Sequence, residues 1–391
     1  MATPRKKKGR RALSHTGGRS ERRGQAEAAR TLAHCLDVGK LDPDRLTHGF
    51  HSYPARMHWG VAERALSALA PEGGRVLDPF CGSGTVLIEA RVQGFAAAGS
   101  DLNPLALRLS ALKTAALGPR SRKHLLGHVQ AIAEASEERV RARQPVQAQL
   151  PKSELQHYGP HILKEMAGLL EEIKAVEDPK QREALLMVFS SIVVKVSKQR
   201  GDTTEGPAEK RLRKGLPTEF FVRKAHELCE RWSEYQPLAK GPAVKLYECD
   251  AREIGDRLRR RADLILSSPP YGGTYDYVAH HQRRFAWLRI RPTKFAAGEI
   301  GARRHGADPK RFDAELLDTL RAMQGVLSPR GQIALLMGDG QHGSRRVPAD
   351  VQLEKLAPEA GLKFVASASQ MRPDFAGHAP RREHLVLLRH A

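Results

Sequence analysis

The stretch VLDPFCGSGTVLIEARVQGFAAAGSDLNP alternates short apolar runs with polar turns in an order that few folds accommodate. Residues 76–77 are typical of a short buried strand, and residues 78–84 of a tight turn. Residues 85–92 carry apolar side chains at helical spacing, residues 95–99 indicate a second strand, and Pro104 marks the start of another helix. This order predicts an α/β fold built on a mostly parallel sheet with right-handed crossovers.

The polar turns of this stretch fall where a ligand would bind. In a parallel sheet, ligands lie outside the carboxyl ends of the strands, where Asp78, the Gly82-Ser83-Gly84 turn and Asp101 would converge. The glycines let the backbone approach a ligand closely, and an acid at the end of the second strand can accept both hydroxyls of a ribose. These residues favour a nucleoside cofactor, although a Gly-x-Gly turn alone is also common in plain packing.

The type of cofactor follows from two departures from the dinucleotide-binding fingerprint. That fingerprint requires a third glycine, but Leu87 stands at its position. The turn is also preceded by Asp78, Pro79, Phe80 and Cys81, and an acid there would repel a pyrophosphate while suiting a cation. S-adenosylmethionine carries a sulfonium and no phosphate, so we expect it to be the cofactor.

A second constrained corner is LILSSPPYGGTYDY, residues 264–277, where an apolar run stops at two serines, two prolines and an aromatic ring. Prolines end strand ladders and tyrosines cap cores in many folds, so the corner alone is typical of a strand-ending turn. A Pro-rich docking peptide is excluded because the apolar run would bury it. The position after an apolar strand and downstream of the glycine turn favours a functional role.

Together, DPFCGSGT, DLNP and SSPPY resemble the motifs of the amino-group methyltransferases that modify DNA at the exocyclic nitrogen of cytosine or adenine. FHSYPARM, residues 50–57, looks like the segment that closes over the methionine part of the cofactor in that family. YECDARE, residues 247–253, looks like the end of the third strand, where Asp250 would reach the adenine amino group. The resemblance implies a methyltransferase domain formed by residues 48–117 and 243–391, with a doubly wound, mostly parallel, seven-stranded Rossmann-like sheet. It implies cofactor contacts from Tyr53, Asp78, Pro79, Phe80, Cys81, Gly82, Gly84, Asp101, Asn103 and Asp250.

The Ser-Pro-Pro-Tyr corner can be explained by the chemistry of that family. An exocyclic amine is a poor nucleophile because its lone pair is delocalised into the base. Ser268 Oγ and the carbonyl of Pro269 can each accept one amine hydrogen and favour a pyramidal nitrogen, while Pro270 fixes the turn. Tyr271 offers a flat face on which a flipped base can stack. Direct displacement needs no covalent intermediate, and the chain has no Pro-Cys pair for ring-carbon methylation, so Cys81 is interpreted as a packing residue.

Two other functions remain open at this stage, as does the choice of base. In the resembling family, a serine at the position of Ser268 goes with cytosine N4, whereas aspartate is usual in adenine-N6 enzymes. The combination DPFCGSGT and LIEA is also similar to transfer-RNA guanine-N2 methyltransferases, which carry an upstream RNA-binding domain for which about fifty residues leave too little room. A nucleic-acid-binding protein that has lost activity would be expected to have damaged motifs, and none is damaged here.

The remaining sequence is strongly basic. The 391 residues carry a formal net charge of +21, which favours a polyanionic partner, and the motifs indicate DNA, with RNA as the alternative. Residues 1–30 are predicted to form a disordered basic arm, and residues 118–242 a helical insertion that recognises the target. Within that insertion, residues 197–217 are predicted to form a mobile loop that can contact phosphates. Its basic residues are Lys198, Arg200, Lys210, Arg211, Arg213 and Lys214, for which a plain solvated loop is the alternative.

The last strands and the cysteines complete the prediction. GQIALLMGDG and REHLVLLRH are typical of buried strands, separated by a helix predicted over residues 348–360. A closing antiparallel hairpin would complete the seven-stranded sheet. The four cysteines form no Cys-x-x-Cys pair, which argues against a zinc site and a disulfide scaffold, and no segment is apolar enough to span a membrane. We therefore expect a cytoplasmic protein without a metal, and the family resemblance implies a cognate restriction enzyme as partner.

Overall fold

The computed structural model describes residues 20–39, 41–144, 147–201, 210, 212–272, 276–302, 308–342, 345–372 and 381–391. Its main feature is an eight-stranded sheet in the order β1-β9-β10-β6-β5-β2-β3-β4. The five strands from β6 to β4 run parallel, and β1, β9 and β10 add antiparallel pairs at the other edge. The strands are β1 (Glu21–Gly24), β2 (Arg75–Asp78), β3 (Ala96–Asp101), β4 (Lys245–Glu248), β5 (Ala262–Ser267), β6 (Leu327–Gly338), β9 (Leu362–Arg372) and β10 (Arg381–His390), with a separate hairpin of β7 (Gly340–His342) and β8 (Arg345–Val347).

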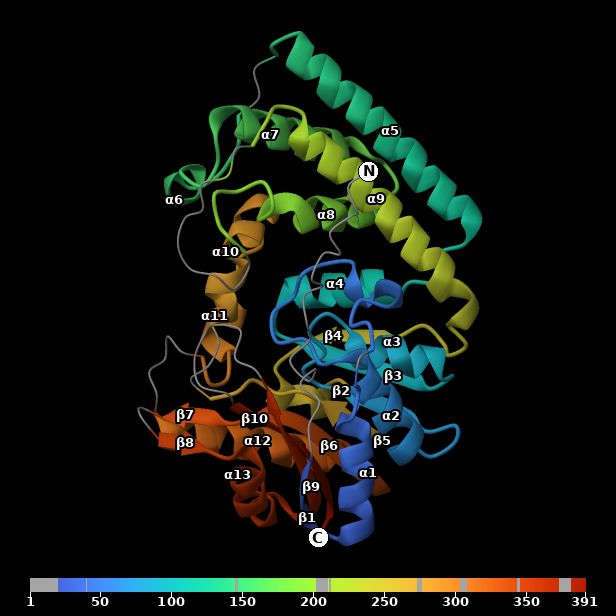
Figure 1. Cartoon of the computed structure of the whole chain (residues 1–391), viewed down its shortest axis with the longest axis vertical. Coiled ribbons are helices and arrows are strands. Elements are labelled where there is room, and N and C mark those ends of the chain that lie inside the picture. The colour runs from blue at the N-terminus through green and yellow to red at the C-terminus, as the bar shows by residue number, and fades with distance from the viewer. Residues whose placement is uncertain are drawn as a thin grey trace, which may run out of the picture.

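Successive strand residues point to opposite faces, and both sets are apolar here, so helices cover both faces of the sheet. Val76 and Leu264 pack on one face with α1, α2 and α3, whereas Leu77 and Ile265 pack on the other with α12 and α13 (Figure 1). The α/β, doubly wound prediction is therefore confirmed. The helices named here are α1 (Ala26–Leu36), α2 (Trp59–Leu69), α3 (Thr85–Val92), α12 (Pro309–Val326) and α13 (Ala349–Leu356).

A block of helices stands at one end of the sheet, in the upper half of Figure 1. Its core is continuous with α4, α10 and α11, through side chains such as Leu109, Phe189, Trp232 and Phe285. At the start of α8 (Pro179–Val193), Asp178 caps the helix by accepting hydrogen bonds from the Lys180 and Gln181 amides. The helices are α4 (Pro104–Thr114), α5 (Pro119–Arg141), α6 (Lys152–Leu155), α7 (Pro160–Ala175), α8 (Pro179–Val193), α9 (Leu216–Tyr235), α10 (Tyr277–Leu288) and α11 (Thr293–Gly298). Short 3-10 turns are η1 (Leu46–Gly49), η2 (Gln236–Leu238), η3 (Ala251–Asp256) and η5 (Pro358–Ala360).

The N-terminal edge corrects two expectations. The sheet has eight strands because β1 pairs antiparallel with β9, and residues 20–30, expected to belong to a disordered arm, form β1 and the start of α1. Arg23 fixes this edge through ion pairs with Asp350 at 2.7 Å and Glu354 at 2.6 Å. All four residues of β1 are exposed, so no apolar alternation announces the strand. Residues 1–19 of the expected arm lie outside the described residues.

Within the described ranges, no helix is both long and apolar enough to cross a membrane.

Candidate functional site

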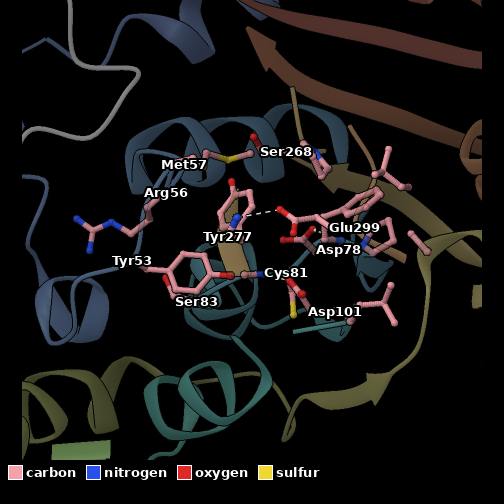
Figure 2. Close-up of a pocket in the computed structure, with 18 of the residues that line it drawn as sticks. Tyr53, Arg56, Met57, Asp78, Cys81, Ser83, Asp101, Ser268, Tyr277 and Glu299 are labelled. Carbon is pink, nitrogen blue, oxygen red and sulfur yellow. Dashed lines mark hydrogen bonds between the residues drawn. The ribbon is translucent and has the colours of Figure 1, made fainter. Parts of the chain in front are cut away.

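A pocket opens at the carboxyl ends of β2, β3 and β5, on the side of the sheet that faces α10 and α11. It holds about 850 Å³ of space between atoms, part of it open solvent. Figure 2 shows side chains of the glycine turn, of the segment after Phe50 and of the α10–α11 region arranged around one space. The lining residues are Tyr53, Ala55, Arg56, Met57, Asp78, Pro79, Phe80, Cys81, Gly82, Ser83, Thr85, Val86, Asp101, Leu102, Asp250, Ala251, Ser268, Pro270, Tyr277, Phe295, Gly298, Glu299 and Ile300.

The glycine turn owes its shape to two left-handed residues. Gly82 and Gly84 have φ angles of 49° and 88°, a region that residues with a Cβ rarely adopt. A Cβ at Gly84 would also approach Ser110 Oγ to 3.0 Å. The Gly82 amide donates to Asp101 Oδ2 at 2.9 Å, and Ser110 Oγ donates to the Gly82 carbonyl at 2.8 Å. The turn therefore holds Asp101 and the start of α3 in a fixed relation.

Two buried carboxyl groups lie in the pocket. Asp101 also accepts the Asn103 amide at 2.8 Å, and burial raises the pKa of Asp101 to about 6. Asp78 accepts a hydrogen bond from Ser267 Oγ at 2.6 Å, and burial raises its pKa to about 7. Because burial disfavours their charged forms, both carboxylates gain from a cationic ligand.

The segment after Phe50 forms one wall of the pocket. The Tyr53 ring stacks on that of Tyr277 with centroids 6.2 Å apart, and the side-chain Nδ2 of Asn103 donates to the Tyr53 hydroxyl at 3.4 Å. The Tyr277 amide donates to Glu299 Oε1 at 2.9 Å, which joins the starts of α10 and of the loop after α11 (Figure 2). Tyr53 and Met57 of the FHSYPARM segment thus line the same pocket as the glycine turn, and the closure of this segment over the methionine part of the cofactor stays a prediction.

The Ser-Pro-Pro-Tyr corner meets this pocket only in part. Ser268 and Pro270, which follow β5, line it together with Asp78 and Asp101. Pro269 is not among the lining residues, and Tyr271 is buried in the α12 side of the core. The Tyr271 hydroxyl donates to Glu383 Oε1 at 3.1 Å, so its ring does not face the cavity in this conformation.

Three expected cofactor residues have other contacts in the structure. Asp250 lines the pocket, but its carboxylate binds the Arg252 guanidinium at 2.6 and 2.9 Å and caps η3. Asn103 caps α4 through the Leu105 amide, and Gly84 precedes α3, and neither lines the pocket. Asn103 and Gly84 therefore fix the starts of α4 and α3 beside the pocket without lining it.

Several lining residues had not been identified as site residues from the sequence, among them Met57, Ser83, Tyr277, Phe295 and Glu299. Ser83 stands inside the recognised turn, so its neighbours were a signal for it. Its Oγ is buried and has no hydrogen-bond partner among the described atoms. Tyr277, Phe295 and Glu299 lie far from the glycine turn in the sequence, and no spacing rule brings them together with it.

The described basic residues of the insertion loop are not among the residues that line the pocket. Lys198, Arg200, Arg213 and Lys214 are exposed, while Lys210 is partly buried and Arg211 lies outside the described residues. Lys198 Nζ donates to the carbonyl of Gln156 at 3.1 Å, and its amide donates to that of His157. His157 in turn is hydrogen-bonded to Arg283 of α10, so the described part of the loop base lies near that helix.

All four cysteines are buried and free. Across the ranges that the structure describes, no three His, Cys, Asp or Glu side chains are grouped as a metal site. Burial raises the pKa of the Cys81 thiol, and a neutral buried thiol suits the packing role expected of it.

Comparison with known proteins bears on this pocket. The DNA methylase family (N6_N4_Mtase) matches residues 16–112, which include the glycine turn and the wall segment. The type II methyltransferase M.MvaI from Kocuria varians is 26% identical over 265 residues, 61% of this chain and 56% of the relative. Both matches support the resemblance of this chain to the amino-methyltransferase family. A second relative, the type II methyltransferase M.ScaI from Streptomyces caespitosus, is 41% identical over 51 residues, 13% of this chain and 17% of the relative. The chain thus spans little more than half the length of M.MvaI.

Solved structures give weaker likenesses. The rRNA methyltransferase aviRa from Streptomyces viridochromogenes is 16% identical with a TM-score of 0.37, covering 91% of this chain and 96% of that one. TrmN from Thermus thermophilus is 15% identical with a TM-score of 0.34, covering 86% of this chain and 49% of that one. TM-scores below 0.5 are too low to assign a substrate.

The cofactor of the family is S-adenosylmethionine, in agreement with the sequence. The pocket fits it on two counts: two buried carboxyl groups suit a cation, and the buried Ser83 hydroxyl has no partner of its own within the described part of the chain.

Proposed function

We propose that this chain transfers a methyl group from S-adenosylmethionine to the exocyclic amino group of a flipped DNA base, and that the base is cytosine, at N4. One observation carries the proposal: Ser268 and Pro270 line the same pocket as Asp78, Gly82 and Asp101. The residues expected to hold the amine and those expected to hold the cofactor therefore adjoin one cavity. Such proximity lets a bimolecular displacement proceed from a preorganised pair.

Each residue has a role in this proposal. S-adenosylmethionine, when bound, supplies an electrophilic methyl group. Asp101 accepts hydroxyl hydrogens of the ribose, and Asp78 offsets the positive charge of the ligand. Ser268 Oγ and the Pro269 carbonyl accept the two amine hydrogens, so that the nitrogen lone pair is directed at the methyl carbon. The order of β5 and β2 in the sheet supports this arrangement, because adjacent parallel strands end at the same edge.

The choice of cytosine rests on Ser268. A neutral hydroxyl accepts a hydrogen bond more weakly than a carboxylate, and in the family a serine there goes with cytosine N4. Adenine N6 is the alternative that keeps the same mechanism.

Base stacking is assigned to Tyr271 by the same resemblance. The contact with Glu383 means that stacking on a base requires the ring to leave the α12 side of the core. We propose that base flipping includes this movement, with the insertion holding the DNA backbone.

The test is transfer of labelled methyl groups from S-adenosylmethionine to genomic DNA and, in parallel, to total transfer RNA, followed by nucleoside analysis. The variant Ser268→Ala tests the amine-acceptor role. It removes one hydrogen-bond acceptor at the pocket and should lower methyl transfer at least tenfold while the cofactor affinity stays nearly unchanged. We expect N4-methylcytosine in DNA. Detection of N6-methyladenine would show that the target base is adenine. Label in transfer RNA alone would overturn the DNA assignment, and cofactor binding without any transfer would indicate a binding protein.

A further inference from the structure

The turn that leads into the pocket wall is held in an unusual way. The anchored turn, residues 43–50, contains η1 and precedes the wall residues Tyr53–Met57. Short turns expose backbone carbonyls that need hydrogen-bond partners. In the anchored turn, many of these partners are cationic side chains from elsewhere in the chain.

Two of the cations come from α9 in the insertion. Arg231 Nη1 donates to the carbonyl of Leu46 at 2.6 Å and also to that of Asp44. Lys224 Nζ donates to the carbonyl of Phe50 at 2.5 Å and lies 4.6 Å from the centre of the Phe50 ring. The Lys224 side chain is only 5% exposed, so water competes little for this bond.

Glu227 orients both cations. Its two carboxylate oxygens accept from Lys224 Nζ at 2.6 Å and from Arg231 Nε at 3.0 Å. The three residues lie on one side of α9 because they are spaced three and four apart. A charged donor fixed in this way gives a stronger and more directional bond to a carbonyl than a neutral one.

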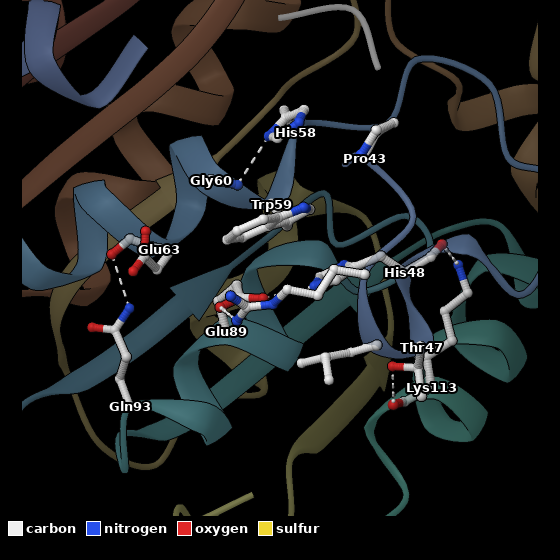
Figure 3. A network of polar contacts seen from close by, with 12 residues as sticks. Pro43, Thr47, His48, His58, Trp59, Gly60, Glu63, Glu89, Gln93 and Lys113 are labelled. Atoms are coloured by element: carbon white, nitrogen blue, oxygen red, sulfur yellow. Dashed lines mark hydrogen bonds and ion pairs between the residues drawn. The ribbon is translucent and has the colours of Figure 1, made fainter. Parts of the chain in front are cut away.

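The sheet domain holds the other side of the anchored turn. Lys113 of α4 donates to the His48 carbonyl at 3.2 Å, and Thr47 Oγ1 donates to the Lys113 carbonyl at 2.8 Å. His48 Nε2 lies 2.7 Å from Glu89 Oε1 of α3, and Figure 3 shows these contacts converging on the turn. The turn is therefore held between α3 and α4 on one side and α9 on the other.

The wall itself continues the connection. Arg56 lines the pocket, yet Figure 2 shows its guanidinium directed away from the other labelled side chains. It returns to the anchored turn, where it donates to the carbonyls of Pro43 and His48 and pairs with Asp44 at 3.0 Å. A displacement of the turn by α9 would therefore be passed to the wall.

We infer that Arg231 and Lys224 are positioning residues for the cofactor site, through which the insertion controls cofactor affinity. Only the identity of the ligand, S-adenosylmethionine, rests on the proposed function. DNA that moves α9 would alter cofactor binding, and by linkage bound cofactor would alter DNA affinity equally.

The test measures S-adenosylmethionine binding by calorimetry and amide hydrogen exchange of residues 50–57 in the full chain without DNA. Arg231→Ala should raise the Kd at least fivefold and speed exchange of these amides, and Arg231→Lys should recover part of both. Lys224→Met keeps the packing on Phe50 and should act in the same direction. The control is Arg223→Ala, an exposed residue of α9 whose guanidinium lies over the Phe220 ring, which should stay within twofold of wild type.

The outcomes separate this inference from the proposed function. Wild-type protein that fails to bind S-adenosylmethionine would refute the proposed function, while hydrogen exchange would still test the connection. Unchanged Kd and unchanged exchange in Arg231→Ala and Lys224→Met would overturn the inference. So would an equal effect of Arg223→Ala, because that would indicate a general loss of stability in α9.

Discussion

At the residue scale, the two buried carboxyl groups decide which ligand the pocket favours and at which pH. Asp101 is held by two backbone amides, and Asp78 by the Ser267 hydroxyl and the Phe80 amide. These bonds favour the charged forms, but burial dominates, so that the pKa values rise to about 6 and about 7. Near neutral pH, a small change in pH therefore alters how far these two carboxyl groups are ionised, and so the negative charge that faces a ligand.

This charge gives a prediction about pH. A cation binds the ionised carboxylates, so S-adenosylmethionine affinity should be high at pH 7.5 and fall as protons are taken up below pH 7 and then below pH 6. Because one pH unit below a pKa leaves about a tenth of the group ionised, we expect the Kd to rise at least tenfold by pH 5. Asp101→Asn should weaken binding at pH 7.5 and flatten the part of the profile near pH 6. Calorimetry at several pH values checks this, and a flat wild-type profile would contradict it.

S-adenosylhomocysteine serves as the control ligand for this experiment, because it has the same ribose and adenine but no sulfonium charge. Its affinity should fall less than that of S-adenosylmethionine over the same range. Equal losses for the two ligands would remove Asp78 from the charge-balancing role.

The same scale shows what could be predicted from single residues. Asp78, Gly82 and Asp101 line one pocket, as expected from motif spacing that places them at strand ends, whereas their contacts with a cofactor stay a prediction. Tyr277 and Glu299 were missed because a tertiary contact, the stacking of Tyr277 on Tyr53, brings their region to the pocket. The side-chain direction of Tyr271 could not be predicted, since it depends on the buried Glu383 more than 100 residues away.

At the element scale, the glycine turn joins β2 to α3 and sets the direction of both. The sequence predicted α3 with its observed bounds, Thr85–Val92, because glycines before an apolar helical pattern mark such a start. It missed β1, whose residues are all exposed and which exists only through pairing with β9. Short edge strands carry no pattern of their own, so their prediction requires the partner strand.

The glycine turn supports a prediction with an internal control. Gly84→Ala places a Cβ at a φ of 88° and close to Ser110, so it should cost about 1–2 kcal/mol of stability and displace the start of α3. Gly127→Ala, at an exposed position within α5 where a Cβ meets nothing within 4 Å, should stabilise by about 0.5–1 kcal/mol. Thermal unfolding of both variants measures this. Equal melting temperatures would show that the turn is not strained by a side chain.

At the scale of the whole molecule, α10 and α11 lie between the sheet and the helical block (Figure 1), and the anchored turn bonds to both through Lys113 and Arg231. The pocket lies at the edge of the sheet that faces the block, so a nucleic acid held by the block would approach the Ser-Pro-Pro-Tyr corner. The net charge of +21 favours a nucleic-acid partner, but it does not show which part of the surface binds that partner. Contacts between the insertion and DNA phosphates would depend on the basic residues of the insertion loop and not on the net charge.

The last prediction separates local from overall charge by salt dependence. Arg200 and Lys214 are exposed in the insertion loop, whereas Arg259 and Arg260 are exposed just before β5, at the end of the sheet opposite the pocket. Replacing either pair with glutamine removes two positive charges, so the two double variants have the same net charge. If the loop contacts phosphates, Arg200→Gln with Lys214→Gln should reduce the slope of log K against log salt concentration for duplex DNA by about 2, and the other pair by much less. Fluorescence anisotropy at several salt concentrations measures both slopes. Equal slopes for the two double variants would mean that DNA responds only to overall charge, and the loop would lose its assigned role.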